Sequence, residues 1–236
     1  GPPEPAAPGG VGSIDQAALE PSGSAPTPGR PTAPALNLAL IAAVNRPGKH
    51  DASGAFVPEG TAWSRANQAS ELFLDAEGLS AQQVRDAVLD QLFRPQHRGL
   101  QQVAFFCHGF PRGIGLGFHG RDGAACLAAG IQSATEQGTV ILYSCSAGQW
   151  FAGELARMLG EGFAVWSHMG RGHTTRNPRL CYARGSESID VWAELTWTRR
   201  RRLRELLRGP ARLQLGAMEP PRLFEILDRP PSDTPG

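Results

Sequence analysis

Two short apolar runs constrain the fold most, because each one ends abruptly in a reactive side chain. Residues 103–107 lead into His108 and Gly109, and residues 139–144 lead into Cys145. Apolar runs of this length are typical of strands buried on both faces, as in parallel sheets covered by helices. Ligands bind beyond the carboxyl ends of such strands. If the two strands are neighbours, an imidazole and a thiol meet at one edge of the sheet, as a thiolate nucleophile and its partner require.

Two further apolar runs, at residues 36–44 and 163–167, predict two more strands. Helices are expected between the strands, and they would cover residues 80–93, 124–134 and 148–160. Ser80 suits the N-cap of the first helix. The third helix would begin just after Cys145, where the positive end of its dipole favours a thiolate. This alternation predicts an α/β fold with a mostly parallel sheet covered by helices on both faces.

The remaining segments are less regular. Residues 49–62 look like a loop. Residues 62–78 are ambiguous, and a strand at residues 71–75 after a short helix is one interpretation. The glycine-rich residues 113–120 match neither GxxxxGK[ST] nor a GxGxxG that opens directly into a helix. A short hairpin beside the site, with a turn at residues 121–123, is therefore favoured over a phosphate site. Residues 168–184 look like a loop over the edge of the sheet.

Composition bounds the organisation of the chain and its partners. Residues 1–34 are rich in proline, glycine and alanine, which predicts a flexible tail or linker. Residues 35–228 are expected to form one domain, and residues 229–236 a disordered tail. The apolar fraction of 41% supports a packed core, and the net charge of +1 directs the chain to neither nucleic acid nor a membrane. The basic residues 199–202 are interpreted as a solvated helix face, with a processing site or an anionic partner surface as the alternative.

The four cysteines show no CxxC spacing and are expected to be reduced thiols in a cytoplasmic protein. Cys107 points to the opposite face of its strand from His108, so it is expected to pack in the core. The spacing of Cys107, His108, His119 and Cys126 fits no standard zinc site, and neither a metal nor another cofactor is predicted. No signal peptide is visible, although the chain does not begin with methionine.

The strand ending in His108 and Gly109, the hairpin, the helix and the strand ending in Cys145 resemble, in this order, the caspase-like cysteine peptidases. That clan includes caspases, gingipains, separase and the bacterial CHAT-type proteases. The resemblance covers roughly residues 36–170, and it is to the broader clan because Tyr143-Ser-Cys-Ser-Ala147 stands in place of the caspase pentapeptide. It implies a three-layer caspase-like fold and a cysteine endopeptidase that hydrolyses peptide bonds with a dyad of His108 and Cys145.

The resemblance also implies roles for neighbouring residues. The N–H groups of Gly109 and Cys145 would bind the oxyanion. The primary specificity pocket would be walled by Tyr143 and by the strand that follows, at Trp166, Ser167 and His168. The expected partner is a protein or peptide substrate, and the N-terminal tail suggests an activating partner or a larger parent chain.

Other interpretations stay open at this point. Cys145 can be a buried structural thiol, and His108 a satisfied structural histidine. Residues 144–148 superficially resemble the nucleophile elbow of an α/β-hydrolase, with Ser146 as the nucleophile. That fold requires an acid and then a histidine after the serine, but no histidine follows His173 and Asp190 comes after it. A third possibility is a catalytically inactive interaction module with the same fold.

Overall fold

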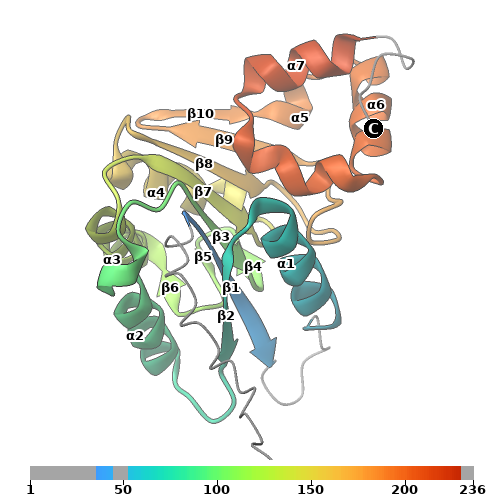
Figure 1. Ribbon diagram of the computed structural model, residues 1–236. Coiled ribbons are helices and arrows are strands. Elements are labelled where there is room, and N and C mark those ends of the chain that lie inside the picture. Colours follow the sequence, from blue (N-terminus) through green and yellow to red (C-terminus); the bar gives the residue numbers. More distant parts are fainter. Residues whose placement is uncertain (1–35, 45–52, 230–236) are drawn as a thin grey trace, which may run out of the picture. The chain divides into compact units, whose positions relative to one another are not determined.

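A seven-stranded sheet forms the centre of the part of the chain that this computed structural model describes, residues 36–44 and 53–229. Its strands are β1 (Asn37–Val44), β2 (Ser70–Asp75), β3 (Gln102–Phe106), β7 (Gly138–Tyr143), β8 (Phe163–His168), β9 (Leu180–Arg184) and β10 (Glu187–Asp190). They lie in the order β10-β9-β8-β7-β3-β1-β2 (Figure 1). β9 and β10 are antiparallel to their neighbours and the others are parallel. The prediction of a mostly parallel sheet is therefore confirmed.

The central strands are mostly apolar because both of their faces are covered. Every residue of β8 is buried, as are four of the five residues of β3. β3 pairs directly with β7, and Phe106 lies opposite Tyr143 at the carboxyl ends of the two strands. The expectation that these two strands are neighbours is confirmed.

Helices pack against both faces of the sheet (Figure 1). One hydrophobic core contains residues of α2 (Ala81–Leu92), α3 (Gly120–Ala134) and α4 (Phe151–Leu159). A second core, on the opposite face, contains residues of α1 (Ser53–Asn67), α6 (Trp197–Leu206) and α7 (Pro220–Asp228). The shorter helices are η1 (Pro95–His97), η2 (Ala147–Gln149), α5 (Val191–Glu194) and η3 (Pro210–Ala217). Within the described ranges, no helix is both long and apolar enough to span a membrane.

Local signals place α2 correctly. The Ser80 hydroxyl accepts a hydrogen bond from the Gln83 backbone N–H at 3.2 Å, and the Gln83 side chain accepts one from the Ser80 N–H at 2.9 Å. This reciprocal capping box satisfies two N–H groups that the helix leaves without partners. Val84, Val88 and Leu92 form the buried stripe of the helix.

Two segments predicted as loops contain some regular structure. α1 begins at Ser53, inside the predicted loop at residues 49–62, and residues 45–52 lie outside the described residues. Its sequence includes Pro58 and has weak helical periodicity, so the burial of Phe56 and Trp63 against the sheet stabilises it. The predicted loop at residues 168–184 contains β9, which pairs antiparallel with β8.

The glycine-rich hairpin is real, but its turn is earlier than predicted. β4 (Gly109–Phe110) pairs with β5 (Gly113–Ile114) across Pro111 and Arg112, and β6 (Phe118–His119) completes a small separate sheet. The predicted turn at residues 121–123 forms the first turn of α3 instead.

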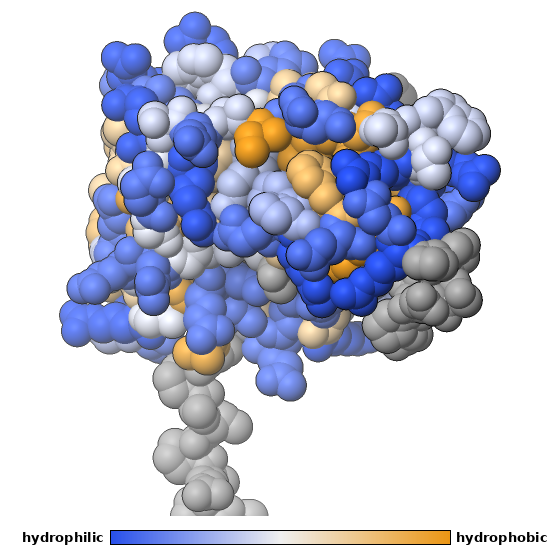
Figure 2. Space-filling model, turned by 90° about the horizontal axis from the view of Figure 1, so that it is seen from above, coloured by the Kyte–Doolittle hydropathy of each residue, from blue (hydrophilic) through white to orange (hydrophobic). Residues whose placement is uncertain are grey.

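The basic run opens α6, and part of it has structural partners. Arg199 forms an ion pair with Asp228 of α7 (Nε to Oδ1 2.7 Å), and Arg200 donates to the backbone carbonyl of Trp192 at 3.0 Å. Figure 2 shows the molecule from the side on which α6 and α7 lie. This face is largely hydrophilic, with small groups of hydrophobic residues. The predicted tails at residues 1–34 and 229–236 lie outside the described residues, except for Arg229.

Candidate active site

His108 and Cys145 follow two neighbouring parallel strands at the same edge of the sheet. Each residue comes two positions after a member of the last register pair, which joins Phe106 and Tyr143. His108 and Cys145 lie just beyond the ends of β3 and β7, where Phe106 stacks on Tyr143. Those two rings are 4.6 Å apart. The structure therefore places the two predicted residues directly after neighbouring strands, at one edge of the sheet.

Gly109 lies directly against the segment that carries Cys145. A Cβ at this position would lie 2.5 Å from the Cys145 carbonyl oxygen and 2.7 Å from Ser144 Cβ. Only glycine permits so close an approach of the two backbones. The Gly115 N–H donates to the His108 carbonyl at 2.7 Å, and Gly109 is paired with Ile114. Because hydrogen-bonded pairs alternate along an antiparallel ladder, the Gly109 N–H points away from β5.

The His108 ring is exposed and meets an aromatic side chain from α1. The Phe56 ring contacts it edge-on, with the ring centroids 5.2 Å apart and the planes at 87°. This wall of the site was not predicted from the sequence, because residues 49–62 were expected to form a loop. The spacing of Phe56 and Trp63, which lie seven residues apart, was the available signal.

The chain turns sharply after Cys145 instead of entering a helix. Ser146 has a left-handed backbone (φ 60°, ψ 0°), which is uncommon for a residue other than glycine. The turn η2 follows, and α4 begins only at Phe151, so the predicted helix is present but its start at residue 148 is wrong. The Phe151 N–H donates to the Pro111 carbonyl at 3.1 Å. Since a helix dipole acts mainly within the first turn, the expected support of a thiolate by this helix is lost.

A hydrogen-bonded loop, residues 169–179, lies over the thiol. The Cys145 thiol contacts the Gly172 carbonyl (Sγ to O 3.7 Å), and the Ser146 N–H donates to the Gly170 carbonyl at 3.3 Å. The base of the loop is closed by the Met169 N–H, which donates to the Arg179 carbonyl at 2.7 Å. The partly exposed Cys145 side chain is therefore bordered by backbone on this side.

Glu59 of α1 holds the loop of residues 169–179 by a hydrogen bond, and its role was not predicted from the sequence. Its carboxylate accepts hydrogen bonds from the Thr175 hydroxyl and from Arg212 Nε of η3, the latter at 3.1 Å. Burial favours the neutral acid, but the hydrogen bonds from Thr175 and Arg212 outweigh this effect and lower the pKa of Glu59. Three segments distant in sequence meet here, and no local motif announces such a contact.

The four predicted pocket residues are all buried. Tyr143 and Trp166 belong to the second core and are each 2% exposed, and Ser167 and His168 are covered as well. The Trp166 indole N–H donates to the Met218 carbonyl at 3.1 Å. Within the described residues, the Tyr143 hydroxyl, the Ser167 hydroxyl and His168 Nδ1 have no hydrogen-bond partner. Their role as pocket walls stays a prediction.

Burial also governs the titration of two of these side chains. It raises the pKa of the Tyr143 hydroxyl, so this residue stays neutral. It lowers the pKa of His168 to about 4, although the contact of Nε2 with the Thr174 carbonyl (2.7 Å) opposes the shift. His168 is therefore a neutral core imidazole at neutral pH and no proton donor to a leaving group.

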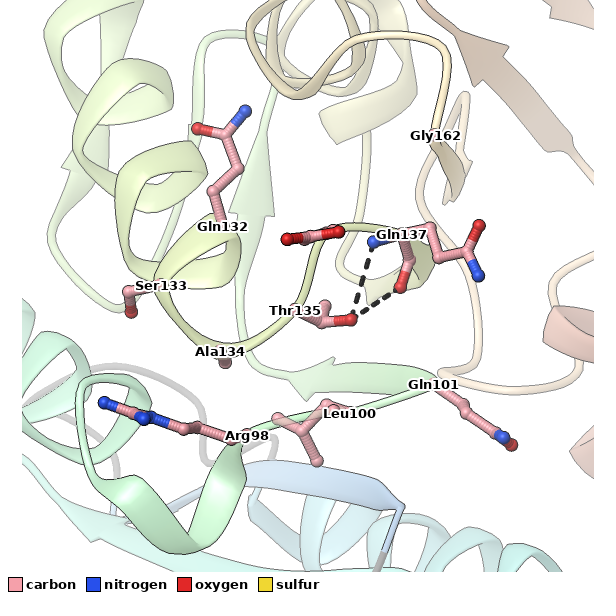
Figure 3. Close-up of a pocket in the computed structure, with 11 residues that line it drawn as sticks. Arg98, Leu100, Gln101, Gln132, Ser133, Ala134, Thr135, Gln137 and Gly162 are labelled. Atoms are coloured by element: carbon pink, nitrogen blue, oxygen red, sulfur yellow. Dashed lines mark hydrogen bonds between the residues drawn. The ribbon is translucent and has the colours of Figure 1, made fainter.

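A separate pocket of about 740 Å³ opens at the amino ends of β3, β7 and β8, opposite the edge that carries Cys145. Polar side chains from the end of α3 and from the loops before these strands surround it, among them Gln132, Gln101 and Arg98 (Figure 3). It contains none of the predicted site residues.

No three His, Cys, Asp or Glu side chains of the described residues are grouped as metal ligands would be. Cys107, predicted to pack in the core, is 1% exposed, with its sulfur 3.2 Å from the Ser144 hydroxyl. No protein-family model matches the chain and no curated protein matches it, so any role of His108 and Cys145 has to be argued from the geometry itself.

Proposed function

We propose that the chain is a cysteine endopeptidase in which His108 and Cys145 form the catalytic dyad. The observation that carries this proposal is the register of β3 and β7, which brings the segments that bear the two residues side by side at one edge of the sheet. The close contact of Gly109 with Ser144 and Cys145 supports it, because the backbone that follows the histidine borders the nucleophile. Positive-φ backbone at Ser146 adds support, since such conformations cluster at active sites.

The connectivity supports a caspase-like arrangement. The chain passes from β3 through the small sheet of β4, β5 and β6 to α3, and then to β7. This is the order of strand, hairpin, helix and strand that the resemblance implies, and helices cover both faces of the sheet.

The reaction would proceed through an acyl-enzyme. The Cys145 thiolate attacks the scissile carbonyl carbon, and the negative charge that develops on oxygen is stabilised by the N–H groups of Gly109 and Cys145. The carbon–nitrogen bond then breaks as His108 donates a proton to the leaving amine. A water molecule, deprotonated by His108, hydrolyses the thioester and releases the acid and the thiol.

Cleavage of a peptide library, followed by mass spectrometry, tests the proposal. Cys145→Ala and His108→Ala are each expected to abolish most turnover while leaving the melting temperature nearly unchanged, because both residues lie at the rim of the sheet. The double variant should lose no more activity than either single variant, since the two residues act as one unit. Cys126→Ser is the matched control for loss of a partly exposed thiol. Turnover that survives in Cys145→Ala would refute the proposal.

A serine hydrolase remains the second candidate only because Ser146 has a left-handed backbone at the end of a strand. The two histidines that follow it do not support this assignment. His168 is buried with Nε2 at the Thr174 carbonyl, and an acid between the serine and His173 would have to be found among Glu154 and Glu161. A fluorophosphonate that labels Ser146, while a thiol probe leaves Cys145 unmodified, would favour the hydrolase. Failure of both probes would favour a catalytically inactive module.

A further inference from the structure

Three segments surround Cys145, and none of them contains an acidic residue. They are residues 107–119, 144–150 and 169–179, joined by the contacts of Gly109 and Gly172 with Cys145. The whole chain has 22 acidic residues and a net charge of +1, so the surroundings of the thiol differ from the rest of the molecule. The basic side chains in these segments, besides histidines, are Arg112, Arg171, Arg176 and Arg179.

Two of these arginines are well placed to bind anions. Arg112, in the β4–β5 turn, stacks on Trp150 with its guanidinium carbon 4.6 Å from the ring. Arg171 is exposed beside Gly172, whose carbonyl contacts the thiol. Among the described residues neither arginine forms an ion pair. A stacked guanidinium keeps its edge N–H groups available, and these match a carboxylate in a bidentate geometry.

Two acidic side chains near this region, Glu59 and Glu154, are already neutralised. Glu59 has a side chain only 10% exposed, and it pairs with Arg212 at 3.1 Å and with Arg176 at 3.9 Å. Glu154 of α4 accepts hydrogen bonds from two arginines, each at 2.8 Å. Neither carboxylate is paired with Arg112 or Arg171, so the charges of these two guanidinium groups are not neutralised by Glu59 or Glu154.

We infer that the site takes acidic peptide segments, whose carboxylates bind Arg112 on one side of Cys145 and Arg171 on the other. Cleavage of such segments rests on the proposed function, whereas their binding does not. A short carboxylate-rich peptide fits better than a nucleic acid, because the chain as a whole lacks the positive field that long polyanions require.

Alkylation of Cys145 measures the local potential without any need for turnover. The rate with iodoacetate, an anion, is compared with the rate with neutral iodoacetamide, and partly exposed Cys126 serves as the internal reference. In low salt, one guanidinium about 8 Å from an anion raises its local concentration about twofold, so two should give Cys145 about a fourfold preference for iodoacetate. High salt should remove the preference.

Arg112→Gln combined with Arg171→Gln should also remove the preference for iodoacetate. The matched control is Arg94→Gln with Arg98→Gln, which removes two exposed arginines beside η1, before the amino end of β3. A preference that is the same at Cys145 and Cys126, or that survives in the Arg112 and Arg171 variant, would overturn the inference.

Protection experiments separate the inference from the proposed function. A glutamate-rich peptide should slow the reaction of Cys145 with iodoacetamide, while its glutamine counterpart and oligothymidylate should not. Equal protection by the glutamine peptide, or stronger protection by oligothymidylate, would contradict the acidic-peptide assignment. Protection without cleavage would refute the endopeptidase and leave the binding inference standing. Equal cleavage of acidic and neutral peptides would refute the acidic-peptide inference and leave the endopeptidase proposal standing.

Discussion

The contact between Gly109 and the Cys145 segment makes Gly109→Ala an informative substitution. The new methyl group would lie 2.5 Å from the Cys145 carbonyl oxygen and 2.8 Å from the Ser144 carbonyl carbon, where ordinary contact begins at 3.4 Å. Both obstacles are backbone atoms, which cannot rotate away as the end of a side chain can. One strand end must therefore move by nearly 1 Å relative to the other.

This displacement has two measurable consequences. Overpacking of this kind costs about 1–3 kcal/mol, which corresponds to a melting temperature lower by about 2–12 °C for a chain of this size. A misplacement of about 1 Å at a reacting centre reduces turnover on the order of 100-fold. Thermal unfolding followed by circular dichroism gives the first quantity, and kcat/KM on the best peptide of the library gives the second.

Gly153→Ala is the control, because it adds the same methyl group to α4, where the nearest atom outside the helix lies at 3.8 Å. Alanine is favoured over glycine in a helix by about 1 kcal/mol, so this variant should be slightly more stable and equally active. An unchanged melting temperature and turnover in Gly109→Ala would show that the two strand ends do not need their close approach.

Three further predictions follow from the buried polar groups. Glu59→Gln leaves Arg212, whose side chain is 16% exposed, without its carboxylate, and we expect a loss of about 3–5 kcal/mol in urea denaturation. Because the folded-state pKa of Glu59 is lowered, its ionised carboxylate stabilises the fold above the unfolded-state pKa of about 4.3, and this stabilisation is lost as pH falls through the folded-state pKa. The difference in free energy of unfolding between wild type and Glu59→Gln should therefore shrink in acid. The pKa of His168 is lowered to about 4, so protons bind preferentially to the unfolded chain. The free energy of unfolding should therefore fall by roughly 3 kcal/mol from pH 6.5 to 4. A His168→Gln variant whose stability falls as steeply with pH would refute the attribution of this pH dependence to His168. Tyr143→Phe removes a buried hydroxyl that has no partner among the described residues, so it should raise the free energy of unfolding or leave it within about 1 kcal/mol, and a larger loss would reveal a contact at this hydroxyl.

Strands and caps could be predicted from the sequence because their causes are local. β3, β7 and β8 are buried on both faces, which requires apolar residues in succession and leaves a run that can be read directly. Ser80 and Gln83 form a capping box within four consecutive residues. The order of these strands and of α2 and α3 was sufficient to predict an α/β fold with a mostly parallel sheet.

Other elements depend on contacts between distant segments. α1 has little periodicity of its own, and it is stabilised by packing of Phe56 and Trp63 in the core. The start of α4 is delayed by the turn after Cys145, where a Cβ on Gly148 would lie 2.8 Å from Cys181 Cβ of β9. No pattern within either segment carries this information.

The sequence by itself determined that His108 and Cys145 end two buried strands, because burial on both faces and an abrupt polar end are local properties. Only the tertiary structure decided that the strands are neighbours in register, since strand pairing depends on the whole sheet. It also decided what surrounds the thiol. Phe56 and Glu59 belong to α1, and the loop over Cys145 is formed by residues 169–179, far along the chain. Folding brings these segments to the site through long-range packing and hydrogen bonds that no local pattern encodes.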